Sequence, residues 1–581
     1  MDTEQMNAKD IVQKYDRLEL KGFDESEIGF EFSSIPIEER SETENLAEWT
    51  AFKLVEGGDN NWQTYYGPFL ITPEGNCVPS RESITPEIIQ VWEQRLNEVP
   101  NPILKARYSG LLVEFKQKCD GQIRKTHVES LLDCVNGHYL KHDEDYPRKL
   151  VRAFHVANSM KNTQILDSVK EAIVKYETSS TSDYDAKLWC PLFRLMLENM
   201  SQFSEEEEAF ASRMENRIAK LCDKQLDGKG AERFDVFVIE QGSVLLAKYY
   251  VKKQKKEEAK RVLDNLNAAF HKGFSSFSVI QINGMLDNLL RLYNSFGFQT
   301  EAKKVLLELQ QNSEALTSAL STIDASVKIP VKTIEKHVQK ITEGTFDEVI
   351  GKFLFTYIPD KNEMQETLRE KVVRNPLYAA ITHQLLDYKG RPTSIIRSIK
   401  SDFDGHLILH INDVLESYSI YLHPVIQNAT EKGLFNTTTI LQYVKNSPFF
   451  ESDRIPIVEQ GLNSFFNGDY VTFLHLIIPQ IENAIRNIVE ESGHSTIKFQ
   501  KHGDGFEIKT LEELLRDDAI VQLDEGNLSL YLRVLFTDQR GWNLRNNICH
   551  GSAPLSWFNP TTADRVFHAL ICVASITLVK D

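Results

Sequence analysis

The chain has 581 residues, of which 41% are hydrophobic and 26% are charged, a balance typical of globular proteins. Lys and Arg number 66 against 84 Asp and Glu, so the formal net charge is −18. This charge excludes a protein that coats nucleic acid through its overall field, and any nucleic-acid contact must come from a local basic site.

The sequence indicates a cytosolic, cytoplasmic protein without a membrane anchor. The longest nearly apolar run, from Val566 to Val579, is shorter than the about 20 residues of a membrane-spanning helix. The N-terminus lacks the basic and apolar segments of a secretory signal. The seven cysteines include no C-x-x-C pair, which excludes a zinc ribbon and a thioredoxin-like motif. We expect reduced thiols, no metal and no cofactor.

Residues 1–120 are expected to form a mixed, mainly helical N-terminal region. The stretch 65–80 is rich in Pro and Gly, which predicts irregular or short-stranded structure. Thr85 followed by Pro86 is a helix start signal, and apolar residues recur with helical periodicity over 101–118.

Residues 121–345 are expected to form α-helical hairpins. The segment 250–263 aligns with 293–306, sharing Tyr, Glu-Ala and Val-Leu at matching positions. Such a repeat suggests a short α-solenoid-like array, although two imperfect copies also arise by coincidence between helix pairs.

Residues 346–460 are expected to form a helical linker domain, interrupted over 387–398 where Gly390 and Pro392 break the helix. Residues 461–581 are expected to form a compact C-terminal bundle of four or five helices. The predicted fold is therefore all-α, with a solenoid-like N-terminal region followed by a helical bundle.

Several common site motifs are absent from the sequence. It contains no G-x-x-x-x-G-K-[ST] phosphate loop, no G-x-G-x-x-G, no H-E-x-x-H and no G-x-S-x-G elbow. His406 and His410 have the i, i+4 spacing of a metal-chelating pair, with Asp404 and Asp413 nearby. Because no third ligand follows at motif spacing, we interpret them as ordinary half-exposed histidines.

The strongest candidate for chemistry is the segment RGWNLRNNICHG at 540–551. Asn546 and His550 are i, i+4 neighbours on a helix, while Arg545 reaches in from the flank. Gly551 is expected to end this short helix. Adjacent helical residues point about 100° apart, so we expect Cys549 to face the core rather than to pair with His550.

A second helix, expected over 469–493, supplies a partner surface. It begins at a plausible Asp469 cap, and Glu482 and Arg486 lie beside its apolar stripe at i, i+4 spacing. If the two helices pack antiparallel, Glu482 holds Arg545 in position, or Arg486 adds positive charge to the site.

The motif R-N-x-x-x-H near the end of a four-helix block resembles the signature of the HEPN superfamily. The pattern HLIIPQIENAIRN, TLEELL and LYLRVLFTDQRGWNLRNNICHG is similar to the bacterial DUF4209 domain over roughly residues 465–555. The resemblance implies a metal-independent endoribonuclease or a catalytically inactive RNA binder, of a kind found in toxin–antitoxin, phage-defence and stress systems. It implies that Arg545 and His550 are the catalytic pair, that Asn546 is their polar companion, and that Glu482 and Arg486 support them.

These residue types fit RNA cleavage. In that reaction the 2′-hydroxyl attacks the adjacent phosphate and leaves a 2′,3′-cyclic phosphate and a 5′-hydroxyl. A histidine exchanges protons near neutral pH, and general acid–base help contributes about 10²–10⁴-fold. An arginine presents a planar fork of donors to phosphoryl oxygens.

One histidine is a proton-transfer group short of an acid–base pair. The resemblance implies a homodimer through the C-terminal domain, whose two R-x4-H segments face each other across a two-fold axis. Such a dimer concentrates Arg486, Arg540 and Arg545, and makes Arg540 a weaker RNA-binding candidate. A regulatory or antitoxin protein is a further expected partner. The alternatives are an inactive HEPN module that binds RNA or protein, and a helical scaffold.

Overall fold

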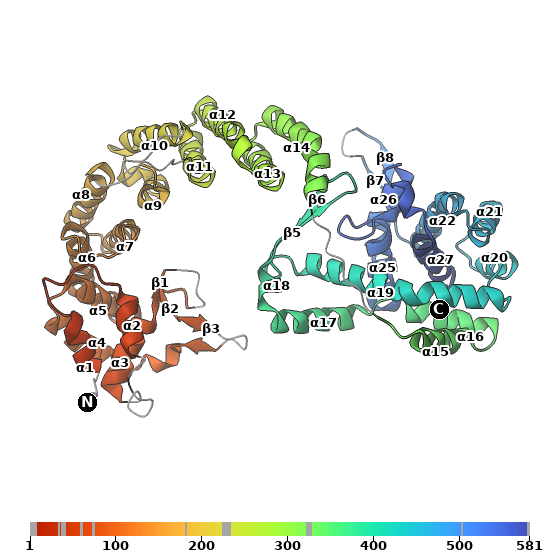
Figure 1. The fold of residues 1–581 in the computed structure, drawn as a ribbon, viewed down its shortest axis with the longest axis horizontal. Helices are drawn as coiled ribbons and strands as arrows, with labels where there is room; N and C mark the ends of the chain where they lie inside the picture. Colours follow the sequence, from red (N-terminus) through yellow and green to blue (C-terminus); the bar gives the residue numbers. More distant parts are fainter. Residues whose placement is uncertain are drawn as a thin grey trace. The chain divides into compact units, whose positions relative to one another are not determined.

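The computed structural model describes residues 8–32, 35, 42–57, 62–71, 76–179, 183–223, 234–320, 328–500 and 503–577. Most of these residues are helical and each sheet among them has two strands, which confirms the expected all-α class (Figure 1). None of the helices in these ranges combines the length and the apolar character needed to cross a membrane.

The chain divides into two compact units, Met1–Leu309 and Gln310–Asp581, each with its own hydrophobic core. This division is coarser than the four segments of the sequence-based one. The helices of the first unit are α1 (Ala8–Tyr15), α2 (Glu25–Glu31), α3 (Thr43–Lys53), α4 (Pro86–Glu98), α5 (Pro102–Phe115), α6 (Gly121–Asn136), α7 (Asp145–Ser159), α8 (Thr163–Ser179), α9 (Ala186–Glu198), α10 (Glu207–Cys222), α11 (Val236–Lys252), α12 (Lys256–Gly273) and α13 (Val279–Ser295), with α14 (Gln299–Ala319) crossing the boundary.

Short strands and 3₁₀ turns interrupt these helices. Two antiparallel pairs confirm short-stranded structure in and beside 65–80: β1 (Val55–Glu56) with β2 (Tyr66–Gly67), and β3 (Leu70–Ile71) with β4 (Cys77–Val78). The 3₁₀ turns of this unit are η2 (Arg81–Ser83), η3 (Met200–Gln202) and η4 (Phe274–Ser276).

Consecutive helices of the first unit pack as hairpins. Helix α6 contacts α5 and α7, α11 contacts α10 and α12, and α9 contacts both α7 and α11. Figure 1 shows α6 to α13 following one another in chain order. Neighbour-to-neighbour packing of this kind is the arrangement of an α-solenoid.

The two aligned sequence segments adopt the same local structure. Tyr250 and Tyr293 each lie in the last turn of a helix, α11 and α13, and the next helix begins at the equivalent position in both. The turns match as well, because Gln254 (φ 59°) and Gly297 (φ 79°) are left-handed at equivalent positions. The alignment therefore marks a repeated helix–turn–helix unit.

The second unit is a helical bundle with two β-hairpins. Its helices are α15 (Val331–Thr342), α16 (Phe346–Thr356), α17 (Lys361–Arg374), α18 (Pro376–Ala380), α19 (Phe403–Glu431), α20 (Thr437–Lys445), α21 (Ile455–Phe466), α22 (Tyr470–Glu491), α23 (Leu511–Leu515), α24 (Asp518–Val521), α25 (Asn527–Phe536), α26 (Leu544–Cys549) and α27 (Pro560–Ala574), with the 3₁₀ turns η5 (Leu523–Gly526) and η6 (Leu555–Trp557).

Helix α27 is the centre of this bundle. Every residue from Thr562 to Ala574 is buried, and the helix contacts α16, α19, α20 and α22. Helix α22 in turn contacts α21, α23 and α26. The buried helix therefore fixes α22, and α22 positions the short helix α26.

The irregular stretch expected over 387–398 is partly a hairpin. Strand β5 (His383–Leu386) pairs antiparallel with β6 (Pro392–Ile396) around a turn that contains Gly390 (φ 75°). A second hairpin, β7 (Ile497–Phe499) with β8 (Phe506–Ile508), follows α22 and had no counterpart in the sequence analysis. Both depend on cross-strand pairing, which helical periodicity does not register.

Candidate functional site

Helix α22 carries two residues of the candidate site, Glu482 and Arg486. The Asp469 carboxylate caps its N-terminus by accepting from the Thr472 N–H at 3.1 Å, and Gly493 (φ 80°) follows its end, as the sequence indicates. The stripe from Leu474 to Ile488 is buried against the bundle, which leaves Glu482 and Arg486 on the half-exposed flank.

Helix α26 packs against α22 and is anchored by two apolar side chains. Asn543 precedes it in a left-handed conformation (φ 51°), and Leu544 and Ile548 are buried. The helix ends at Cys549 with His550 as its C-cap, and Gly551 (φ 68°) turns the chain away, as expected. These anchors place the polar residues of the helix on the side that faces α22.

Arg545 is the centre of the cluster. Its Nε donates to Oε2 of Glu482 at 2.8 Å, and its Nη2 donates to Oε1 at 3.3 Å. Its Nη1 donates to Oδ1 of Asn546 at 3.3 Å and lies 3.5 Å from Nε2 of His550. The structure thus brings together Glu482, Arg545, Asn546 and His550, from two helices that are far apart in the sequence.

The amide of Asn546 is held in one orientation. Its Nδ2 donates to the Oδ1 of Asn543 at 2.7 Å and to the carbonyl of Thr537 at 3.3 Å. Its oxygen therefore points toward Arg545, and Asn546 connects the guanidinium to the loop before α26.

The cluster is open to solvent on the histidine side. His550 is exposed, whereas the side chains of Arg545 and Glu482 are 23% and 16% exposed. The hydrogen bond to Glu482 raises the pKa of Arg545 against the opposing effect of burial. The guanidinium therefore stays charged, and the imidazole is accessible to a ligand.

The two other predicted arginines have different surroundings. Arg486 donates to Glu482 at 3.4 Å and to the carbonyl of Lys509 at 3.1 Å, so it belongs to the edge of the cluster. Arg540 instead pairs with Asp538 at 2.8 Å and Asp404 at 2.7 Å. The Arg540 guanidinium is therefore already paired with two carboxylates.

The expectation for Cys549 was wrong. This residue is exposed rather than core-facing. The angle between neighbours on a helix does not say which of them meets the core, and in α26 Leu544 and Ile548 take that role.

His406 and His410 do not form a metal cluster with other residues that the structure describes. The expectation of two half-exposed histidines was wrong for His406, which is buried: its Nε2 is 2.7 Å from the Arg397 carbonyl, and its ring packs against Tyr378 and His383. Across the described ranges, no three His, Cys, Asp or Glu side chains come together as possible metal ligands.

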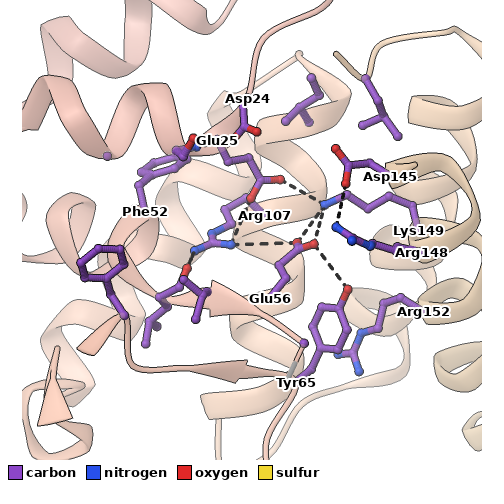
Figure 2. A pocket seen from close by; sticks show the side chains of 18 of the residues that line it. Asp24, Glu25, Phe52, Glu56, Tyr65, Arg107, Asp145, Arg148, Lys149 and Arg152 are labelled. Carbon is purple, nitrogen blue, oxygen red and sulfur yellow. Dashed lines mark hydrogen bonds and ion pairs between the residues drawn. The ribbon is translucent and has the colours of Figure 1, made fainter. Parts of the chain in front are cut away.

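The first unit contains a cavity of about 1010 Å³ that the sequence analysis did not anticipate (Figure 2). On its floor, Lys149 donates to Glu56 at 2.8 and 2.9 Å and to Glu25 at 3.2 Å, and Arg107 pairs with Glu25 at 3.0 Å. Tyr65 donates to Glu56 at 3.4 Å. This cluster ties α2, β1, α5 and α7 together.

The floor of this cavity is electrostatically balanced. Burial alone would raise the pKa of Glu56, but Lys149 and Arg107 outweigh it and lower the value to about 2. Burial dominates at Glu25 and raises its pKa. These residues come from four distant segments, and the only sequence signal was a charged Arg107 within an apolar helical stripe.

Comparisons with known proteins assign no family to this chain. No family model, no curated protein and no solved structure matches it.

Proposed function

We propose that the second unit is a metal-independent endoribonuclease of the HEPN type. The observation that supports this best is the contact between Arg545 and His550, 3.5 Å apart and held by Glu482 and Asn546. A charged guanidinium beside an accessible imidazole supplies anion binding and proton transfer at one point, which phosphodiester transesterification requires.

In the proposed reaction the 2′-hydroxyl of RNA loses its proton to a histidine and attacks the adjacent phosphorus. A bond forms between O2′ and phosphorus, and the bond to the 5′ oxygen breaks. That oxygen leaves with a proton from a second group, so the products carry a 2′,3′-cyclic phosphate and a 5′-hydroxyl. Arg545 neutralises the charge that develops on the phosphoryl oxygens.

The remaining residues of the cluster have supporting roles in this proposal. Glu482 fixes the direction of the Arg545 guanidinium by accepting two hydrogen bonds, and Asn546 accepts a third from its Nη1. His550 of a second copy is the second proton-transfer group, because this cluster contains one histidine. We infer a homodimeric cytoplasmic enzyme that acts as a toxin or antiviral effector, restrained by its N-terminal unit or by an antitoxin-like protein.

The test is cleavage of total tRNA and of a structured RNA by the full-length protein in EDTA, with analysis of the product ends. We expect wild type to leave cyclic-phosphate ends and His550→Ala to lose at least about 10²-fold in rate. The matched control is His271→Ala, which changes an exposed histidine of α12.

Retained cleavage by His550→Ala, or equal loss in His271→Ala, would contradict the site assignment. Absence of cleavage by every variant, together with RNA or protein binding that needs Arg545, would favour the inactive module. Neither cleavage nor binding would favour the helical scaffold.

A further inference from the structure

The β7–β8 hairpin has an apolar face that is about half or more exposed in the described part of the chain. Ile497 lies opposite Ile508 and Phe499 opposite Phe506, so the four side chains share one face of the two strands. Their exposed fractions are 48%, 64%, 77% and 59% in that order. The two phenylalanine rings contact each other at 4.8 Å between centroids.

The opposite face of the hairpin is polar and anchored to its own unit. Lys498 pairs with Glu507 at 3.2 Å and with Glu513 of α23 at 2.6 Å. Lys509, which follows β8, pairs with Asp517 at 3.4 Å. The polar contacts therefore hold the hairpin with its apolar face toward solvent, and carboxylates neutralise both lysines.

The base of this hairpin is bonded to the candidate site. Arg486 donates to the carbonyl of Lys509 at 3.1 Å and to Glu482 at 3.4 Å, and Glu482 holds Arg545. A continuous series of hydrogen bonds thus connects the site to the residue that follows β8. A partner that covers the hairpin face therefore binds a hairpin whose base is bonded to the site.

We propose that this face binds the same face of a second copy of the chain. The two cross-strand pairs are of like residues, so a two-fold axis along the strands places isoleucine against isoleucine and phenylalanine against phenylalanine. Such a surface is self-complementary. This dimer deepens the function proposed above, on which its catalytic purpose rests, because that function needs a second copy to supply a second His550.

The face supplies about half of the area of a standard dimer interface. An aromatic side chain buries about 150–250 Å² and an isoleucine somewhat less, so four side chains that are half to three-quarters exposed contribute roughly 400–500 Å² per copy. A standard interface buries about 800 Å² per partner. The hairpin therefore supplies the apolar centre of the proposed interface, and polar residues around it supply the remaining area.

Other occupants fit this face less well. Its four side chains offer no cation to a phosphate, and the nearby lysines are neutralised by Glu507, Glu513 and Asp517. The same carboxylates repel anionic lipid headgroups. The remaining kind of occupant is an apolar protein surface. The same face on a second copy of the chain is such a surface, and the structure defines its shape and chemistry.

The test compares three full-length proteins by sedimentation over a concentration series: wild type, Phe499→Glu/Phe506→Glu, and Phe355→Glu. Phe355 lies on α16 in the same unit and is 73% exposed, so it controls for an added charge at an exposed phenylalanine. We expect wild type and Phe355→Glu to dimerise equally. The hairpin variant should raise the dimer dissociation constant at least about tenfold with unchanged circular dichroism.

Wild type that stays monomeric at all concentrations, or a hairpin variant that dimerises as wild type does, would overturn the proposal. His550→Ala should dimerise normally, because it removes the site and leaves the hairpin intact. Hairpin-dependent dimers without any RNA cleavage would therefore contradict the proposed activity and still support the interface.

Discussion

A guanidinium that binds phosphate must point one way before its ligand arrives. In this cluster Glu482 accepts two hydrogen bonds from Arg545, and both side chains are more than three-quarters covered. The carboxylate both orients the fork and competes with a phosphate for its charge. In the proposed nuclease, Glu482 is therefore a positioning residue with opposite effects on the orientation of Arg545 and on its affinity for phosphate.

Replacing Glu482 by glutamine separates these two effects. Glu482→Gln removes the carboxylate charge, so Arg545 is less firmly directed but freer to bind an anion. We expect kcat for RNA cleavage to fall about 10–100-fold while KM stays equal or falls, as measured by steady-state kinetics. Glu451→Gln, which breaks an exposed pair with Arg454, is the control. A fall in kcat that tracks a lowered Tm, or a raised KM, would refute the positioning role.

The turn between α25 and α26 determines where the site helix begins. The backbone N–H of Trp542 donates to the carbonyl of Val534 at 2.9 Å, so the chain folds back closely on the end of α25. A Cβ on Gly541 would overlap that carbonyl oxygen. The glycine is needed here because two backbones approach each other, and α26 takes its position from this contact.

Gly541→Ala is expected to disturb the site through the backbone alone. The added methyl group forces the turn apart, which should lower stability by about 1–3 kcal/mol and displace Arg545 from Glu482. Thermal unfolding and RNA cleavage measure the two effects. Gly351→Ala is the control, since its Cβ meets nothing within 4 Å in the interior of α16 and should be neutral or stabilising. Equal Tm values for the two variants would contradict the argument.

Helical spacing was sufficient to predict the main elements of this site. The cap at Asp469, the i, i+4 relation of Glu482 and Arg486 and the stop at Gly551 all follow from local rules. The packing of α26 on α22 was expected only conditionally, because it depends on the burial of Leu544 and Ile548. The prediction for Cys549 was wrong because helical spacing alone does not say which residues of α26 meet the core.

The features that the sequence did not predict depend on distant pairings. The cavity floor joins Glu25, Glu56, Arg107 and Lys149, and no local pattern relates positions so far apart. The β7–β8 hairpin alternates apolar and polar residues over only three positions per strand, which is too short a pattern to distinguish a strand from a loop.

At the scale of the whole molecule, each unit contains a histidine that folding buries in its neutral form. Burial lowers the pKa of His127 in the first unit and of His568 in the second from 6.5 to about 3. His568 lies between the Tyr531 hydroxyl and the Phe353 carbonyl, at 2.9 and 3.2 Å. Because the cores are separate, each histidine affects the stability of its own unit.

These histidines predict that both units lose stability as the pH falls. Their folded-state pKa values lie below the unfolded value, so the stability is complete above about pH 6.5 and is lost as the pH falls toward 3. Between pH 7 and pH 5 the free energy of unfolding should fall by about 2 kcal/mol per histidine. Urea denaturation at the two pH values measures it.

His568→Gln is the variant that isolates this effect. It lowers the stability of the second unit at pH 7. The loss of unfolding free energy between pH 7 and pH 5 should, however, be about 2 kcal/mol smaller for the second unit than in wild type, and unchanged for the first unit. An unchanged pH difference in the second unit would refute the assignment to His568.

The contact between Arg545 and His550 also favours one tautomer of the neutral ring. A guanidinium only donates, so a hydrogen bond across this 3.5 Å contact uses the lone pair of Nε2 and leaves the ring proton on Nδ1. This tautomer enters a reaction as a base. In the symmetric dimer proposed above, both rings begin in the same state, so one must acquire a proton before it serves as the acid. Under that proposal, two copies identical in sequence are chemically unequal during each turnover.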